Sequence, residues 1–209
     1  YRSDAPLPPG TLVRVPLGRR EVLGVVWNDE PPQALPGDVA EKPVAGVLEG
    51  LAPLAAAWRQ LVQFAAGYYQ RGIGEVALAA LPPQLRDLDT TQLARRLKRK
   101  AAAEDDAPAS PAPALTGQQQ AAVDAVAQGP GPFLLYGATG SGKTEVYLQS
   151  VQRLVDADPQ AQALVMVPEI NLTPQLLARF TERFGAGRVV PMHSGLTPAQ
   201  RLKAWLAAH

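Results

Sequence analysis

The 209-residue sequence has no cysteine and only two histidines, His193 and His209. Without cysteine, these residues hold no disulfide scaffold, no thiolate zinc site and no cysteine nucleophile. Two histidines are too few for a histidine-rich metal centre. No uncharged apolar run approaches the roughly 18 residues of a membrane span, and no signal-peptide pattern opens the chain. The formal net charge is only +1, so contact with nucleic acid has to rest on local patches rather than on bulk charge.

The length suits one large domain or two small ones, and the patterning divides the chain into three parts. Residues 1–88 are rich in short β-like runs, which lie at 11–15, 21–27 and 43–48. These runs predict a small antiparallel sheet with a hairpin loop at Pro16–Arg20 and a longer loop at 31–37. Both ends of the chain look cut, so we expect a fragment of a longer protein.

Helical spacing replaces the β pattern between residues 53 and 81. One apolar stripe includes Trp58, Tyr68 and Tyr69, and a short second helix ends before Pro82. We expect both helices to pack on the sheet. The three aromatic side chains are then core residues rather than platforms for stacking bases.

Residues 89–114 are expected to form a flexible linker. The run Leu93–Lys100 is basic and compatible with a helix, and alanine, proline and serine dominate the end of the segment. Such a composition does not bury a core by itself. The basic run is either a solvated face or a contact for phosphate.

Residues 115–209 alternate strand and helix patterns, which predicts a parallel α/β sheet. Apolar strands are predicted at 133–136, 163–167 and 189–192. Helices are predicted at 145–155, 174–184 and 198–208. The last two follow Thr173 and Thr197, whose hydroxyls suit an N-cap before a proline in the first turn.

The strongest motif is a phosphate loop between the first of these strands and the helix that follows it. It consists of Gly137, Ala138, Thr139, Gly140, Ser141, Gly142, Lys143 and Thr144, which fit G-x-x-x-x-G-K-[ST]. Glycines let the backbone turn its N–H groups onto phosphate oxygens, and the helix N-terminus favours negative charge. We assign Lys143 to the β- and γ-phosphates and the Thr144 hydroxyl to Mg²⁺, so ATP or GTP is the predicted ligand.

Hydrolysis requires an acidic pair on a second strand, and no Asp-Glu pair follows an apolar strand after the loop. Glu169 follows the strand at 163–167 but has no adjacent acid. We therefore expect this chain by itself to bind nucleotide poorly and to hydrolyse it slowly, if at all.

Several strings occur together in a specific order. The string LTGQQQAAV precedes the loop, GATGSGKTEVYL contains it, and PEINLTPQ and HSGL follow it. In this order they resemble the first motor domain of the PriA family of bacterial replication restart helicases, which are superfamily 2 DNA helicases. Residues 1–88 resemble the 3′-end-binding domain of the same family. The resemblance covers nearly everything except the linker.

The resemblance implies an α/β protein. A small β-rich DNA-binding domain with two helices spans 1–88, and 115–209 is the N-terminal part of a RecA-like parallel α/β motor. It also implies binding to stalled forks and D-loops at the nascent 3′ end, and ATP- and Mg²⁺-dependent unwinding in the 3′→5′ direction. Implied partners are branched and single-stranded DNA, primosome proteins, a replicative helicase loader and single-stranded-DNA-binding protein, with no membrane. The implied location is the bacterial cytoplasm, at the nucleoid, and zinc is expected only in the missing C-terminal part.

Site residues carry over by position. Gly18 and Lys42 match the pocket for the 3′ nucleotide, Gln119 matches a glutamine that reads adenine, and Thr173 lies in a segment that contacts single-stranded DNA. The residues alone allow plainer interpretations, namely a turn glycine, a solvated lysine, one glutamine of three on a helix face and a helix cap. His193 is either a motif residue that senses DNA or nucleotide, or an ordinary histidine at a strand end.

The departures from the family leave a second hypothesis open. The winged-helix domain that the family places before the motor does not fit into 89–114. In the family, a Phe-Asp just ahead of the position of Tyr1 would complete the 3′-end pocket. The alternative function is a non-catalytic fork-binding primosome adaptor with a degenerate motor. A generic NTPase of the ABC or signalling type would require an acidic strand and a signature loop, and would leave 1–88 unexplained.

Overall fold

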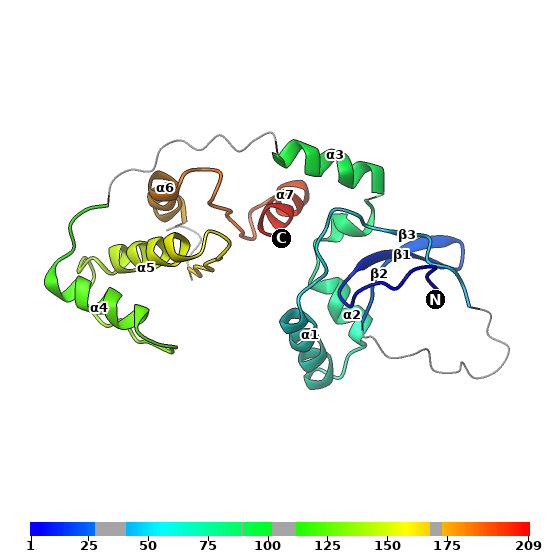
Figure 1. The fold of residues 1–209 in the computed structure, drawn as a ribbon, viewed down its shortest axis with the longest axis horizontal. Helices are drawn as coiled ribbons and strands as arrows, with labels where there is room; N and C mark the ends of the chain where they lie inside the picture. Colours follow the sequence, from blue (N-terminus) through cyan, green and yellow to red (C-terminus); the bar gives the residue numbers. More distant parts are fainter. Residues whose placement is uncertain (28–40, 89, 102–111, 168–172) are drawn as a thin grey trace. The chain divides into compact units, whose positions relative to one another are not determined.

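The computed structural model describes residues 1–27, 41–88, 90–101, 112–167 and 173–209. It divides into two compact units, which we describe separately (Figure 1). Unit 1 combines Tyr1–Glu104 with Met192–His209, and unit 2 is Asp105–Pro191. The longer loop predicted at 31–37 lies outside the described residues.

The predicted antiparallel sheet is confirmed in unit 1. Strand β1 (Leu12–Leu17) lies between β2 (Arg20–Val25) and β3 (Gly46–Val47), and both neighbours run antiparallel to it. Leu17 pairs with Arg20, so the hairpin turn is a two-residue turn and is shorter than predicted. Gly18 occupies it with φ +62°, a left-handed conformation that two-residue hairpin turns require.

Two helices and a 3₁₀ turn follow the sheet, namely α1 (Ala56–Tyr68), α2 (Ile73–Ala79) and η1 (Pro83–Arg86). The buried face of α1 carries Val62 and Ala66. Trp58 packs partly buried against the core, with its ring centroid 6.4 Å from that of Trp27. The core assignment of Trp58 is therefore confirmed.

The core assignment of Tyr68 and Tyr69 is wrong, because these side chains are 70% and 69% exposed. Tyr68 follows Val62 by six residues, which places it about 120° away around a helix of 3.6 residues per turn. Leu61 and Phe64 share that outer face and are also exposed. Tyr69 lies beyond the last helical residue, so helical periodicity does not apply to it.

The core of unit 1 joins segments that are distant in the sequence. Helix α3 (Thr90–Ala101) and helix α7 (Pro198–Ala208) each insert a fully buried leucine, Leu93 and Leu202. The core consists of Leu12, Leu23, Leu48, Leu54, Leu81, Leu85, Leu88, Leu93, Leu202 and Leu206. The segment expected to be a flexible linker thus begins with a helix that contributes to a core, because the basic run also carries apolar residues at helical spacing.

A buried arginine fixes β1 to η1. Arg14 is 7% exposed, and its guanidinium donates to the backbone carbonyls of Leu85, Arg86 and Leu88. A buried charge needs such partners to offset its lost hydration. The interaction holds the end of the N-terminal domain against the sheet.

Unit 2 contains helices α4 (Gly117–Ala127), α5 (Lys143–Ala157) and α6 (Thr173–Phe184). Helix α4 begins with a capping box formed by Thr116 and Gln119, and Thr197 and Gln200 form another at α7 of unit 1. The helices predicted after the two Thr-Pro pairs are confirmed. None of the described helices is long and apolar enough to cross a membrane.

The three strands predicted for the second part do not form within the described residues. Segments 133–136, 163–167 and 189–192 have no ladder partner there. Leu134 and Tyr136 are 92% and 94% exposed, and Leu164 and Met166 are similarly exposed. A short apolar segment becomes a strand only when a neighbour accepts its hydrogen bonds, so apolar patterning alone was not sufficient.

Candidate nucleotide-binding loop and DNA-end site

The phosphate loop forms a tight turn directly before α5. Gly140 and Gly142 both have φ +82°, and Gly142 is the N-cap of the helix. The Ser141 N–H donates to the Ala138 carbonyl at 3.2 Å. Left-handed residues within such a turn direct backbone N–H groups into an anion-binding concavity, and the N-terminus of α5 adds a partial positive charge.

Lys143 is folded over the loop that precedes it. Its Nζ donates to the carbonyls of Gly137 and Ala138, at 2.6 and 2.7 Å. The ammonium group therefore lies beside the loop, where a phosphate oxygen can replace the two carbonyls. Thr144 follows in the first turn of α5 and is half-buried. The chemistry of this donor set fits a nucleotide phosphate and a hard cation.

Gln119 lies against the same loop. Its Oε1 accepts from the Thr116 N–H at 2.9 Å, and its Nε2 donates to the Gly142 carbonyl at 3.4 Å. The structure thus brings together Gln119 and the loop residues, which sequence spacing alone did not require. The capping box is the local signal that fixes the direction of this side chain.

Helix α5, which follows the phosphate loop, takes part in two ion pairs of equal length. Arg183 Nη2 lies 2.7 Å from Glu145 Oε1, and these side chains are 7% and 18% exposed. Arg153 Nη1 lies 2.7 Å from Asp124 Oδ1, but there both side chains are about two-fifths exposed. The hydrogen bond from Arg153, with a second from Gln120, lowers the pKa of Asp124 below its ordinary value of 3.8.

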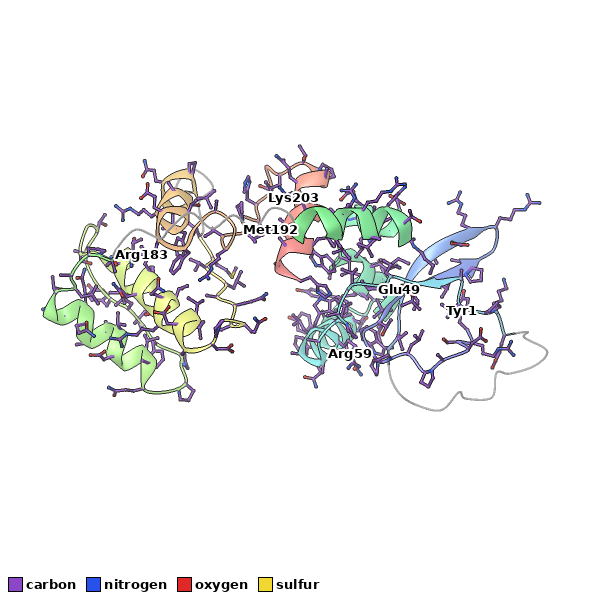
Figure 2. The ribbon with its side chains drawn as sticks, turned by 45° about the horizontal axis from the view of Figure 1, so that its top comes forward. Tyr1, Glu49, Arg59, Arg183, Met192 and Lys203 are labelled. Carbon is purple, nitrogen blue, oxygen red and sulfur yellow. The ribbon has the colours of Figure 1, made fainter. Side chains whose placement is uncertain are left out.

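The pair Glu145–Arg183 was missed by the sequence reasoning. Glu145 lies in the first turn of α5 and Arg183 in the last turn of α6, and Figure 2 labels Arg183 at the end of that helix. The two residues are 38 positions apart. A signal did exist, since an acidic residue two positions after the loop lysine needs a neutralising partner if it is buried.

The predicted DNA-end residues lie at one end of the sheet. Gly18 occupies the β1–β2 turn. Strand β3 runs antiparallel to β1, so the residues just before β3, which include Lys42, lie toward the end of β1 at which this turn begins. Tyr1 Oη donates to the Pro16 carbonyl at 2.9 Å, and the Arg2 N–H donates to the Lys42 carbonyl at 2.9 Å. The N-terminal segment therefore connects the two elements, and both Gly18 and Lys42 are exposed beside it.

For the other predicted site residues, the structure shows fewer contacts. Thr173 begins α6, but its side chain lies outside the described residues, as does Glu169. The Nδ1 atom of His193 is buried and has no hydrogen-bond partner among the described residues. No group of acidic or histidine side chains suited to a metal ion occurs in the described ranges.

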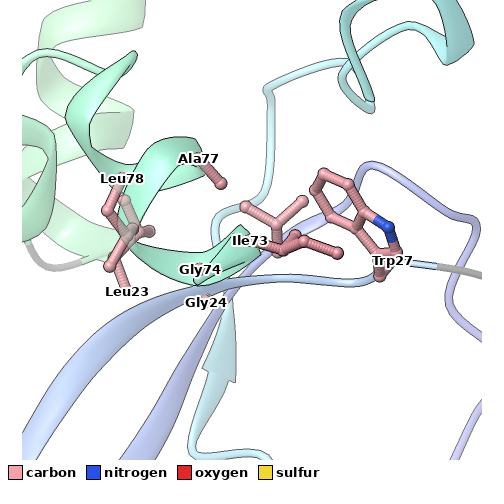
Figure 3. Close-up of a pocket in the computed structure, with 8 residues that line it drawn as sticks. Leu23, Gly24, Trp27, Ile73, Gly74, Ala77 and Leu78 are labelled. Atoms are coloured by element: carbon pink, nitrogen blue, oxygen red, sulfur yellow. The ribbon is translucent and has the colours of Figure 1, made fainter. Parts of the chain in front are cut away.

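A separate hollow of about 250 Å³ lies between β2 and α2 (Figure 3). It is lined by Leu23, Gly24, Val25, Trp27, Ile73, Gly74, Ala77 and Leu78. This lining contains no charged side chain, so it does not fit a phosphate. It belongs to the packing of α2 on the sheet.

Comparison with known families gives two matches, in the order that the two sites follow along the chain. Residues 1–82 match the 3′DNA-binding domain of PriA, and residues 116–208 match the DEAD/DEAH box helicase family. The α/β fold class is confirmed, with an antiparallel sheet in unit 1 and a RecA-like helicase match over the phosphate loop.

Curated relatives are similar to the chain over different lengths. The chain is 29% identical to replication restart protein PriA of Rickettsia felis over 192 residues. This alignment covers 92% of this chain and 27% of that protein. With the PriA of Treponema pallidum it shares 29% identity over 206 residues, 94% of this chain and 29% of the relative. Identity to the Bacillus subtilis PriA is 49% over 77 residues, 37% of this chain and 9% of that protein. These segments span less than a third of each relative's length. The chain is therefore similar to PriA replication restart proteins, and its first part is similar to their 3′DNA-binding domain.

Proposed function

We propose that this chain is the DNA-end-binding and nucleotide-binding part of an ATP-dependent replication restart helicase. The observation that carries the proposal is the formed phosphate loop, with Lys143 and Gln119 both held against it, in a chain that begins with a 3′DNA-binding domain. The loop supports nucleotide binding, and the N-terminal match supports recognition of a DNA end.

Each loop residue has one task in the proposed nucleotide site. The backbone N–H groups from Ala138 to Lys143 bind phosphate oxygens, and Lys143 exchanges its two loop carbonyls for the β- and γ-phosphates. The Thr144 hydroxyl binds Mg²⁺. Gln119 reads the edge of adenine with the amide that now contacts Gly142. When bound, ATP supplies the phosphoanhydride whose cleavage drives a helicase motor.

The proposed DNA-end site uses the end of the sheet near the hairpin turn. Gly18 has no side chain, and open space surrounds the position where a Cβ would lie, so a nucleotide can approach the backbone closely. Lys42 supplies a positive charge for a backbone phosphate. Thr173, at the start of α6, contacts single-stranded DNA through its hydroxyl and through backbone N–H groups of the first helical turn.

For the whole protein we propose binding to stalled forks and D-loops, unwinding in the 3′→5′ direction and loading of the primosome. Its proposed partners are primosome proteins, the replicative helicase loader and single-stranded-DNA-binding protein. A chromosomal substrate of this kind implies action at the nucleoid, in the bacterial cytoplasm.

The first experiment tests the DNA-end site. Fluorescence anisotropy of the full 209-residue chain is measured with a fork carrying a 3′-hydroxyl at the junction and with the same fork capped by a 3′-phosphate. We expect tighter binding to the free hydroxyl and loss of that preference in Lys42→Ala. Lys203→Ala, which removes another exposed lysine of unit 1, controls for the change in charge. Equal binding of both forks by the unmodified chain contradicts the end site.

The second experiment separates a motor from the adaptor hypothesis. A fluorescent ATP analogue with Mg²⁺ is titrated into the chain and into Lys143→Ala, for which we expect at least tenfold weaker binding. DNA-stimulated ATP hydrolysis is then measured with the whole protein. Nucleotide binding without hydrolysis in the whole protein favours the non-catalytic adaptor, whereas hydrolysis abolished by Lys143→Ala favours the motor.

A further inference from the structure

The largely buried ion pair Glu145–Arg183 joins α5, the helix that follows the phosphate loop, to α6, the helix that begins at Thr173. Glu145 lies two residues after Lys143, and Arg183 lies at the opposite end of α6 from Thr173. A helix of twelve residues is about 18 Å long and moves as a rigid rod. If Arg183 followed a displacement of Glu145, the whole of α6 would move with it, including its start.

The charge of Glu145 makes this position sensitive to nucleotide. The helix dipole stabilises a carboxylate in the first turn of the loop helix, but this carboxylate repels a phosphate bound at the same helix end. Arg183 neutralises it at 2.7 Å in surroundings where both side chains are largely buried, so solvent screens the interaction little. Arrival of a polyphosphate changes the electrostatic environment of this pair directly.

The pair is also incompletely satisfied. Arg183 donates to Glu145 through Nη2, while its Nη1 is buried without a hydrogen-bond partner among the described residues. Buried donors are usually paired. An arginine with an unused donor can bind a second acceptor when its surroundings change. An ion pair with only a structural role gains nothing from an unused donor.

From these observations we propose that Glu145 and Arg183 are positioning residues that couple nucleotide binding at the phosphate loop to single-stranded DNA binding at the start of α6. This inference rests on the proposed function of both sites. It assigns to the pair the task of making each ligand change the affinity for the other, without contact between Arg183 and either ligand.

The test measures a coupling factor in the full chain. The dissociation constant of a fluorescent ATP analogue with Mg²⁺ is determined with and without saturating oligo-dT that carries a 3′-phosphate, so that the DNA-end site is not engaged. We expect oligo-dT to tighten nucleotide binding by about fivefold or more, a typical size for coupling between sites, and the nucleotide to tighten oligo-dT by the same factor. In Glu145→Gln, Arg183→Met and the double variant we expect a factor near one.

A second readout separates coupling from folding. The single variant Arg183→Met leaves a buried carboxylate without its partner and is expected to melt earlier, whereas the double variant has no lone charge and recovers much of its melting temperature. Its coupling factor remains near one. Arg183→Lys, which keeps the charge, is expected to fold and to retain part of the coupling.

The matched control is Arg153→Met, which breaks an ion pair of the same length that is more exposed and involves α4 instead of α6. It is expected to leave the coupling factor unchanged. Coupling that survives in the double variant, or that falls equally in Arg153→Met, overturns the inference. If the unmodified chain binds both ligands without coupling, the inference alone fails, whereas if it binds no nucleotide, the proposed function fails first.

Discussion

Gly142 combines two constraints at the start of α5. Its φ of +82° lies in the left-handed region, and a Cβ placed on it would lie 2.2 Å from Nε2 of Gln119. The residue therefore allows both the turn of the loop and the approach of Gln119. Glycine at this position is required by the backbone and by a neighbour on another helix, and only the first requirement is visible in the motif.

We predict that Gly142→Ala weakens nucleotide binding by at least tenfold. The left-handed conformation costs an alanine about 1 to 2 kcal/mol, and the methyl group displaces Gln119 from the loop. Titration with a fluorescent ATP analogue measures the loss. Gly129→Ala is the control, because Gly129 has no left-handed φ and open space around its Cβ position, and its affinity should equal that of the unmodified chain.

The ion pair of Asp124 gives a prediction about acid stability. Because Arg153 lowers the pKa of this carboxylate below 3.8, its contribution is fully present above that ordinary value and is lost as the pH falls through the lower folded-state pKa. We expect Asp124→Asn to be less stable than the unmodified chain at pH 7. The difference should shrink below pH 4.

Thermal unfolding at a series of pH values checks this expectation. Gln120 also donates to Asp124. In a Gln120→Ala background, we expect the stability difference that Asp124→Asn causes at pH 7 to be smaller but not abolished. A gap between the curves that stays constant down to pH 2 would show that the pair contributes nothing through its charge.

At the scale of elements, helices and the hairpin were predictable because their signals are local. Thr-Pro pairs, alternating residues and a glycine turn act within a few positions, and each formed near its expected place. The strands expected at 133–136 and 163–167 were not predictable from local signals, because a parallel strand depends on partners distant in the sequence. For the same reason the ion pair Glu145–Arg183 was not predicted from the sequence, although Glu145 follows the phosphate loop and Arg183 lies near the end of a predicted helix.

The apolar segments that have no strand partner in the described part of the chain should make it self-associate. Leu134, Tyr136 and Leu164 are nearly fully exposed, and exposed apolar segments without a covering partner are aggregation sites. We expect concentration-dependent association in sedimentation experiments and strong binding of an apolar dye. Leu134→Ser with Tyr136→Ser should reduce both signals, whereas Leu61→Ser, on the outer face of α1, should reduce them less.

At the scale of the whole chain, the family matches and the packing divide the sequence differently. The helicase match extends to residue 208, yet α7 packs into unit 1. Leu202 is fully buried there, and Nε2 of His209 lies 2.8 Å from the Ala52 carbonyl oxygen. Sequence order predicted the two parts in succession, and it gave no sign that the last helix returns to the first part.

This packing predicts a large effect of a small change in α7. Leu202→Ala should destabilise unit 1 by about 2 to 5 kcal/mol, the usual cost of emptying a fully buried leucine site. Hydrogen exchange should report faster opening in the β1–β2 hairpin as well as in α7. Lys203→Ala, at the next and exposed position, should leave exchange in the hairpin unchanged, and equal exchange in both variants would contradict the shared core.

The return of α7 to the N-terminal core limits how these two parts can be exchanged between proteins. A DNA-end domain transplanted with residues 1–111 alone would lack Leu202 and Leu206, which belong to the same buried cluster as Leu85, Leu88 and Leu93. A chimera with a foreign motor would have to bring a helix of matching shape at the equivalent position. The two modules are therefore expected to have been inherited together, and recombination that respects only the boundaries between the families should yield poorly folded hybrids.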